Sequence, residues 1–243
     1  MTIHIKAAIG LIESEKITPE LLNERDNYYY TVWHRAAQYT GFKHIPKHFF
    51  TIASVTLRVG DPNSTNEFGK HGDTVLHIAA AHDNLKYIDK EFLTNETLAF
   101  KNSFGMTVWQ VAAKHGTLKD LPLHLLTLAD VEQVDDFCCN LLHSAAQGGS
   151  VQDISVEHLS EHALNQLNNY GDGFREHANA YGKLKSIPAN LITNDFLDAC
   201  RACGAPLFDD EDKKYFKEFF HLSDEPLKIP TSGTLQSSSG VQL

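Results

Sequence analysis

The chain has 243 residues, of which 42% are hydrophobic and 21% charged, a composition typical of a folded protein with a buried core. Its 21 basic and 31 acidic residues give a net charge of −10. This balance argues against nonspecific binding to nucleic acid or to an anionic membrane, which requires a surplus of Lys and Arg. No stretch is apolar over the length needed to span a bilayer, so we expect neither a nucleic-acid nor a membrane partner.

The first residues, MTIHIKAAIGLIESEK, contain an apolar run from Ala7 to Ile12 only. A secretory signal needs a longer apolar region and a cleavage site with small residues. We therefore expect a cytoplasmic protein, or one of a host cytoplasm if it is an effector. Ile5, Ile9 and Ile12 form one apolar stripe, which predicts an N-terminal capping helix.

A segment similar to TVLHIAAAH recurs along the chain and predicts a helix each time. The copies begin at Thr31, Thr74, Thr107, Asn140 and Gly173. Thr and Asn are good N-caps, and apolar residues follow them at helical spacing. Paired alanines in the copies let neighbouring helices approach closely. The fifth copy, GFREHANAY, departs from the pattern, as a unit near the end of a stack can.

Each copy is followed by a turn and a second apolar segment. The turn contains Gly116, Gly149 and Gly182 in the last three copies. Proline near the start of the second segment suits the first turn of a helix and is found at Pro46, Pro122 and Pro188. Another N-cap then predicts a short third helical turn, at Thr18, Thr51, Thr94, Thr127, Ser160 and Thr193.

The spacing of these landmarks indicates a repeated unit. Successive Thr or Ser caps of the third turn are 33, 43, 33, 33 and 33 residues apart, and the helix openings from Thr74 onward keep the spacing of 33. The long interval places a polar insertion, rich in turn formers, between Leu57 and Asp73 and predicts a projecting loop. Units of this size bury their apolar faces by stacking. The predicted fold is all-α, with about five stacked repeats.

The C-terminal region predicts a second cap and a tail. The segment FDDEDKKYFKEFFHL begins with acidic residues that suit a helix N-terminus, and it places Phe216, Phe219 and Phe220 on one face. We therefore expect a repeat domain with both caps over residues 1–222. Residues 223–243 are poor in apolar residues and rich in Ser and Gly, which predicts a disordered tail.

With their 33-residue period, the segments GDTVLHIAAAH and GMTVWQVAAKHG resemble the ankyrin repeat, over roughly residues 26–203. The resemblance implies a helical solenoid of antiparallel helix pairs joined by finger-like loops. It also implies that His34, His77 and His143 brace the loops through hydrogen bonds. The chain departs from the family in reading T-V-[LW]-H for the usual T-P-L-H, and in the prolines that interrupt the second helix.

Metal binding and catalysis find little support. The pairs His44/His48 and His158/His162 have a spacing that can bind a metal from one helix face, but no carboxylate or Cys has matching spacing. The chain has four cysteines, and the repeat places Cys138 and Cys203 on the order of 20 Å apart, too far to share a zinc ion. We expect free thiols, no metal and no cofactor. The sequence has no phosphate loop, H-E-x-x-H or nucleophile elbow, so no enzymatic activity is expected.

The resemblance places a binding face on the loop tips and on the end of the first helix of each repeat. Many residues in these columns are aromatic, as in interface hot spots. Stacking of the loop-tip aromatics on one another is the competing interpretation. The candidate binding residues are Tyr28, Tyr30, Tyr39, His71, His82, Phe104, Met106, His115, Phe137, Tyr170 and Tyr181.

The sequence thus predicts a protein–protein interaction module without catalysis. Its acidic charge would help to select a partner protein with a basic surface. Two alternatives stay open. The first is an inhibitor or antagonist that blocks an enzyme or a nucleic-acid-binding protein by occupying its surface, and the second is an enzyme or metal protein that uses the His-rich faces.

Overall fold

The computed structural model describes residues 3–8, 10–60, 72–188 and 191. Within these residues the regular elements are helices, together with the isolated antiparallel bridges Arg58–Thr74 and Lys101–Thr107. The prediction of an all-α protein is confirmed. None of the described helices has the length and apolar character needed to cross a membrane. The centre of the predicted insertion loop, the second cap and the predicted tail lie outside the described residues.

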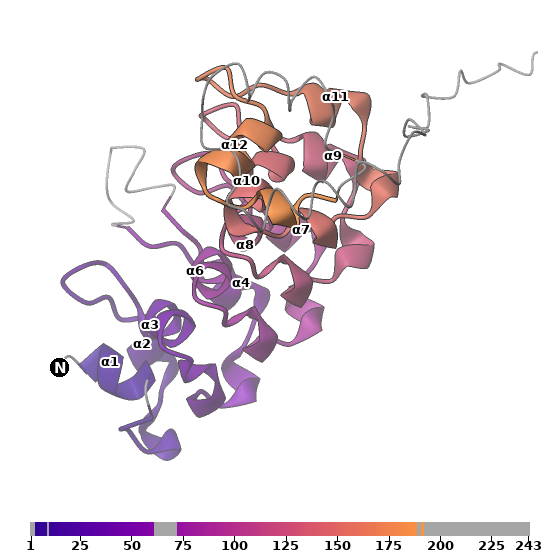
Figure 1. The fold of residues 1–243 in the computed structure, drawn as a ribbon. Coiled ribbons are helices and arrows are strands. Elements are labelled where there is room, and N and C mark those ends of the chain that lie inside the picture. Colours follow the sequence, from indigo (N-terminus) through magenta and orange to yellow (C-terminus); the bar gives the residue numbers. More distant parts are fainter. Residues whose placement is uncertain (1–2, 9, 61–71, 189–190, 192–243) are drawn as a thin grey trace, which may run out of the picture.

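Helices with the recurrent sequence lie side by side and form what we call the inner row (Figure 1). Each helix of the row contacts the next one. The helices are α3 (Val32–Gln38), α6 (Val75–Ala81), α8 (Val108–Lys114), α10 (Leu141–Gly148) and α12 (Phe174–Ala180). We number the units of the stack 1 to 5 after these helices.

The predicted caps open the inner helices. In the three middle units, the side chain of Thr74, Thr107 or Asn140 accepts a hydrogen bond from the backbone N–H three residues later. This bond satisfies one of the amides that a helix start leaves free. Helix α12 begins at Gly173 and has no such bond.

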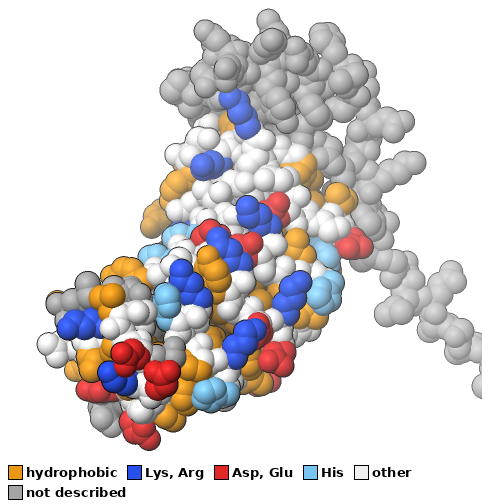
Figure 2. Space-filling view, turned by 90° about the horizontal axis from the view of Figure 1, so that it is seen from below, with side chains coloured by type: hydrophobic (Ala, Val, Ile, Leu, Met, Phe, Trp, Pro, Cys, Tyr) orange, Lys and Arg blue, Asp and Glu red, His pale blue; other side chains and the backbone are white. Residues whose placement is uncertain are grey.

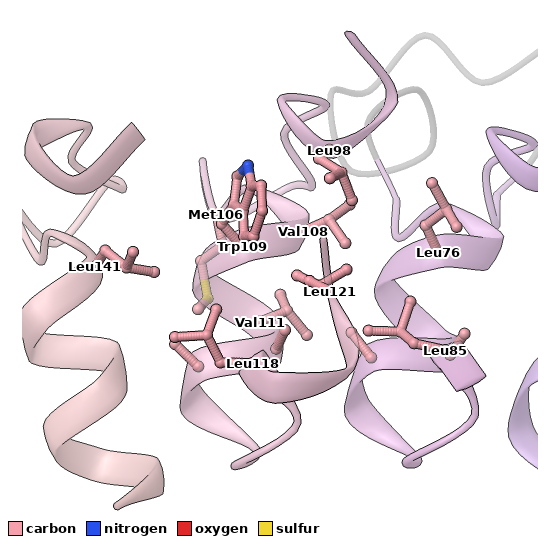
Figure 3. Close-up of a cluster of buried hydrophobic side chains, with 14 of the residues drawn as sticks. Leu76, Leu85, Leu98, Met106, Val108, Trp109, Val111, Leu118, Leu121 and Leu141 are labelled. Carbon is pink, nitrogen blue, oxygen red and sulfur yellow. The ribbon is translucent and has the colours of Figure 1, made fainter. Parts of the chain in front are cut away.

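The core runs along the inner row. The paired alanines of units 1 to 4 are fully buried, which allows the close approach of neighbouring helices. Figure 3 shows Trp109 and Val111 of α8 among leucines contributed by neighbouring elements. Truncating a buried Trp to Ala costs about 3–5 kcal/mol, so Trp33 and Trp109 are major contributors to stability.

The second apolar segment differs from a regular helix. It forms two single 3-10 turns in units 1 to 4, for example η6 (Leu118–Asp120) and η7 (Leu123–Leu125) in unit 3. Between the turns, Leu121 and Pro122 have φ and ψ values outside the helical range. A residue before proline is disfavoured in helical conformation, and proline also lacks the N–H that a helix would need. Proline accounts for the break in units 1 and 3, whereas units 2 and 4 have the same break at Asp89 and Ser155. The expected antiparallel α-helix pairs are not formed. The other 3-10 turns of the stack are η2 (Gly41–His44), η3 (Lys47–Phe49), η4 (Leu85–Tyr87), η5 (Lys90–Phe92), η8 (Val151–Asp153), η9 (Val156–His158) and η10 (Leu184–Ser186).

Short outer helices follow the 3-10 turns, as the Thr and Ser caps predict. They are α4 (Ile52–Val55), α7 (Asn95–Leu98), α9 (Leu128–Glu132) and α11 (Glu161–Asn165), and α2 (Pro19–Asn23) precedes unit 1. In each, the predicted cap side chain accepts a backbone N–H. The last predicted cap, Thr193, lies outside the described residues. At the N-terminus, η1 (Ser14–Lys16) precedes α2, and α1 (Ile3–Ala8) packs on α3 and η2 with Ala7 fully buried.

Buried side chains link successive inner helices. Asn84 Nδ2 donates to the carbonyl of Ala37, and Thr117 Oγ1 donates to that of Ala80, at 2.7 and 2.8 Å. Ser150 Oγ makes the equivalent bond in the next unit. Each bond satisfies a carbonyl near the end of the preceding inner helix. The surface seen from below carries charges of both signs, interspersed with hydrophobic side chains (Figure 2).

Candidate binding groove

A short loop precedes four of the inner helices and begins with Asp or Asn. Its first side chain accepts the backbone N–H groups of the third and fifth loop residues through Oδ1, at 2.8–3.1 Å. The fourth residue has a positive φ. We call these the finger loops, and they comprise residues 26–30, 102–106, 135–139 and 168–172. Because the loops share one conformation, their third residues form a column at the tips.

Inner helices brace the finger loops that follow them. His77 Nε2 lies 3.1 Å from the carbonyl oxygen of Met106, and His143 Nε2 lies 3.1 Å from that of Asp172. The Nδ1 atom of each histidine accepts a backbone N–H at the helix start, so Nε2 carries the proton and donates. Gln110 takes the same role in unit 3. The predicted bracing role is confirmed for His77 and His143, whereas His34 Nε2 lies 3.0 Å from the carbonyl oxygen of Leu57, which follows helix α4.

The bracing histidines are neutral at pH 7. Burial lowers the pKa of His34 to about 3, and it lowers the pKa values of His77 and His143 to about 4. The bond geometry acts in the same direction, because an Nδ1 that accepts an N–H cannot also hold a proton. Each brace therefore depends on the uncharged ring.

Most of the candidate binding residues are exposed. Tyr170 is the most open, with 78% of its surface accessible. The other exposed candidates are Tyr28, Tyr39, His82, Phe104, His115, Phe137 and Tyr181. His71 lies outside the described residues.

Met106 and Tyr30 are less available than the sequence predicts. Met106 is only 7% exposed, since it packs with the buried side chains around Trp109 (Figure 3). Little of its side-chain surface is therefore available for contact with a partner. Tyr30 is half-buried, and its ring lies beneath Arg35, with 4.2 Å between Cζ and the ring centre.

The loop-tip aromatics do not stack on one another in the described part of the chain. Ring pairs there involve residues such as Trp33 and Phe50, or His177 and Tyr181, and none joins two loop tips. The competing structural interpretation is thus not supported for Phe104, Phe137 and Tyr170. Their apolar surface is available for contact.

A hollow of about 290 Å³ lies between the finger loops and helices α8, α10 and α12. We call it the groove. Its lining includes candidates from three successive units, namely Phe104, Met106, Phe137, Tyr170 and Tyr181. The other candidates among the described residues do not line it.

Polar side chains also line the groove, among them Lys114, Asp135, Cys139, Ser144 and His177. Burial raises the pKa of Asp135, with the nearby Lys114 ammonium acting against the rise. Burial raises the pKa of the Cys139 thiol to about 11 and lowers the pKa of His177. The thiol and the imidazole are therefore both uncharged at pH 7.

Neither Asp135 nor Ser144 is among the binding residues predicted from the sequence. Aligning the units by their helix openings would have revealed both. Ser144 corresponds to Arg35 of unit 1, and Asp135 corresponds to Asp26. The signal is a cation that is present in one unit and replaced by a small side chain in another.

The described residues contain no group of three or more His, Cys, Asp or Glu side chains placed to hold a metal ion. Cys138 and Cys139 are free thiols, and both are half-buried. The other two cysteines, Cys200 and Cys203, lie outside the described residues.

No protein-family model and no curated protein matches the chain. Among solved structures, the chain is similar to one from the complex of the predatory endopeptidase Bd0816 of Bdellovibrio bacteriovorus with immunity protein Bd3460. The similarity has a TM-score of 0.51 and a sequence identity of 17%, and it covers 75% of this chain and 94% of that one. At this identity, what the two chains share is the fold.

Proposed function

We propose that this chain is a divergent ankyrin-type repeat protein that binds another protein through the groove and the loop tips and has no catalysis of its own. The 33-residue spacing, the stacked inner row and the histidine braces support the repeat assignment. The main departure is the pair of 3-10 turns in place of a second helix. That departure affects the outer side of the stack and leaves the groove side regular.

One observation carries the binding proposal. Aromatic side chains from three successive finger loops stand exposed around a single hollow, without stacking on one another. Large aromatic side chains beside a concave surface are typical anchors at protein interfaces. Because they come from three units, only the assembled stack presents them together.

An affinity capture from cell extract, analysed by mass spectrometry, tests the proposal. The groove variant carries Phe137→Ala, Tyr170→Ala and Tyr181→Ala. We expect the wild-type chain to retain a partner that the groove variant loses, because hot-spot truncations each cost about 2 kcal/mol or more of binding free energy. Circular dichroism first establishes that the variant is folded.

A control variant removes other exposed side chains away from the groove, with Tyr87→Ala, Leu128→Ala and Val156→Ala. The control should capture the same partner as wild type. If the groove variant retains the partner, or if only the control loses it, the binding face lies outside the groove.

A second candidate function is inhibition of the partner. The observation in its favour is that a chain of similar fold occurs in a complex between an endopeptidase and an immunity protein. If the captured partner is an enzyme, its activity should fall as the wild-type chain is added and should remain unchanged with the groove variant. If the enzyme keeps its full activity when saturated with the wild-type chain, inhibition is excluded and the chain acts as a binding scaffold only.

A further inference from the structure

Unit 1 shows how the stack neutralises a buried acidic residue at the start of a finger loop. Asp26 Oδ1 holds the loop, and its Oδ2 accepts bonds from Nε and Nη2 of Arg35 at 2.9 and 2.6 Å. The guanidinium also covers the ring of Tyr30. Arg35 therefore places two N–H donors on one carboxylate oxygen, and the ring of Tyr30 lies beneath its guanidinium.

Unit 4 has the same loop and the same acid but no such cation. The residue at the position of Arg35 is Ser144, and Cys139 takes the position of Tyr30. Asp135 is only 8% exposed, and its Oδ1 accepts the two loop amides. Its Oδ2 accepts no hydrogen bond from the described residues, and no described cation lies within ion-pair distance. Asp135, Cys139 and Ser144 all line the groove.

The finger loop does not need this charge. Asn102 and Asn168 begin the neighbouring loops and make the same pair of backbone bonds with a neutral amide oxygen. A buried carboxylate without a neutralising cation is unfavourable for folding. Asp135 thus carries a charge that the local structure neither requires nor neutralises.

Two other groups of the groove come near this carboxylate. Lys114 ends helix α8 and is half-buried, but it makes no ion pair with Asp135. His177 on α12 lies toward Asn168, with 3.5 Å between Nδ1 and the amide nitrogen. Neither side chain occupies the position that Arg35 takes in unit 1.

We propose that an arginine side chain of the partner protein enters the groove and places its guanidinium on Asp135, as Arg35 does on Asp26 in unit 1. Phe137, Tyr170 and Tyr181 enclose its stem and its flat faces. Arginine fits better than lysine because its planar guanidinium can place two N–H donors on the one free oxygen, as Arg35 does in unit 1, and stacks on aromatic rings. The net charge of −10 favours the approach of such a cationic segment. This inference rests on the proposed function of the groove.

The test is a selection from a displayed library of random peptides on the immobilised full-length chain. We expect the wild-type chain to enrich peptides in which Arg is flanked by apolar residues. Asp135→Asn should lose these peptides, since it keeps the loop bonds and removes the charge. Glu157→Gln is the matched control, because it removes an exposed charge from the same unit, outside the groove lining, and should enrich the same peptides.

A second variant uses the internal template. Ser144→Arg supplies from within the chain the cation that the partner would bring, so it should exclude the selected peptides while the protein remains folded. If Ser144→Arg fails to fold, Asp135→Asn still decides the question.

Calorimetric titration of one enriched peptide measures how much its arginine contributes to the affinity for the groove. Replacing its Arg by citrulline, a neutral residue of nearly the same shape, should weaken binding about thirtyfold or more. Lys114→Met should strengthen binding about threefold, because it removes a competing cation near Asp135. Weaker binding to Lys114→Met would contradict the arginine assignment and point to an acidic ligand.

The proposal is overturned if the enriched peptides lack Arg, if Asp135→Asn enriches the same set, or if the wild-type chain enriches nothing. Peptides without Arg that still require Phe137, Tyr170 and Tyr181 would leave the groove as the binding site and remove only the arginine. Peptides that bind the groove variant as well as they bind wild type would contradict the proposed function, because the groove would then not be the binding site.

Discussion

Finger loops 1 and 4 have the same backbone conformation and the same acidic first residue, yet their carboxylates are in different environments. In unit 1, burial alone would raise the pKa of Asp26, but the bonds from Arg35 and from the backbone of Tyr30 and Tyr28 lower it. In unit 4, burial prevails and the pKa of Asp135 is raised. The loop conformation requires only one oxygen atom of the acidic side chain. Neutralising the negative charge requires a cation in addition, which unit 1 has and unit 4 lacks.

Arg35→Met is the variant that should change stability most, because it removes the cation that distinguishes unit 1 from unit 4. It leaves the carboxylate of Asp26 buried without its cation, and we expect a loss of about 3–5 kcal/mol in the free energy of unfolding. Urea denaturation measures the loss. Asp135→Asn, which removes the acid of unit 4 that has no such cation, should stay within about 1 kcal/mol of wild type. The double variant Asp26→Asn with Arg35→Met should regain most of the stability, and a loss as large as that of Arg35→Met alone would mean that packing of the arginine stem, not charge, is responsible.

Acidic pH should weaken the braces of both units. A histidine has a pKa near 6.5 in the unfolded chain, while burial holds that of His34 at about 3 and that of His143 at about 4. The unfolded chain therefore binds more protons below about pH 6.5, and stability falls as the pH decreases toward 4, by up to about 1.4 kcal/mol per pH unit for each histidine.

Glutamine already serves as the brace at Gln110, so His34→Gln and His143→Gln should each fold and reduce this pH dependence. Denaturation at pH 7.5 and 5.5 measures it. An unchanged difference between the two pH values in both variants would show that other groups cause the acid sensitivity.

Ser144→Arg should make unit 4 resemble unit 1. The new guanidinium bonded to Asp135 should raise the free energy of unfolding by about 1.5 kcal/mol. In an Asp135→Asn background the same substitution should bring no gain, and the double-mutant cycle isolates the pair from any change in packing. A gain that persists in that background would place the arginine elsewhere.

The smallest expected effect concerns unit 5, where α12 begins at Gly173 without a side-chain cap. Gly173→Thr supplies a capping hydroxyl opposite Glu176 and should stabilise by a few tenths of a kcal/mol. The added Cβ would meet only the flexible end of Glu176. Hydrogen exchange at the first amides of α12 reports the change, and Gly173→Ala, which has no cap, should show no such protection.

The repeated elements could be predicted from the sequence because their causes are local. Thr94 or Thr127 caps its own helix, and the paired alanines need only the helical period to meet the next unit. The two 3-10 turns were not foreseen, since the prolines indicate an interruption but not what replaces the helix. The left-handed backbone conformation of non-glycine residues such as Thr40 and Asp83 was not predicted from the sequence either.

The groove was predicted only in outline. The columns of aromatic residues follow from the period, and five of the candidates do line one hollow. The burial of Met106 depends on the packing around Trp109, which the period does not specify. The charge arrangement depends on the absence of a long side chain at Ser144, and an absence becomes visible only when units are compared with one another.

The bonds between units all run in one direction. In units 1 to 3, one carbonyl near the end of the inner helix accepts a hydrogen bond from the unit that follows it in sequence, through Asn84, Thr117 or Ser150. Separating two units breaks this bond and leaves the carbonyl on one unit and the side-chain donor on the other to be hydrated. A force that pulls the stack apart would therefore break one such bond at each of these three junctions.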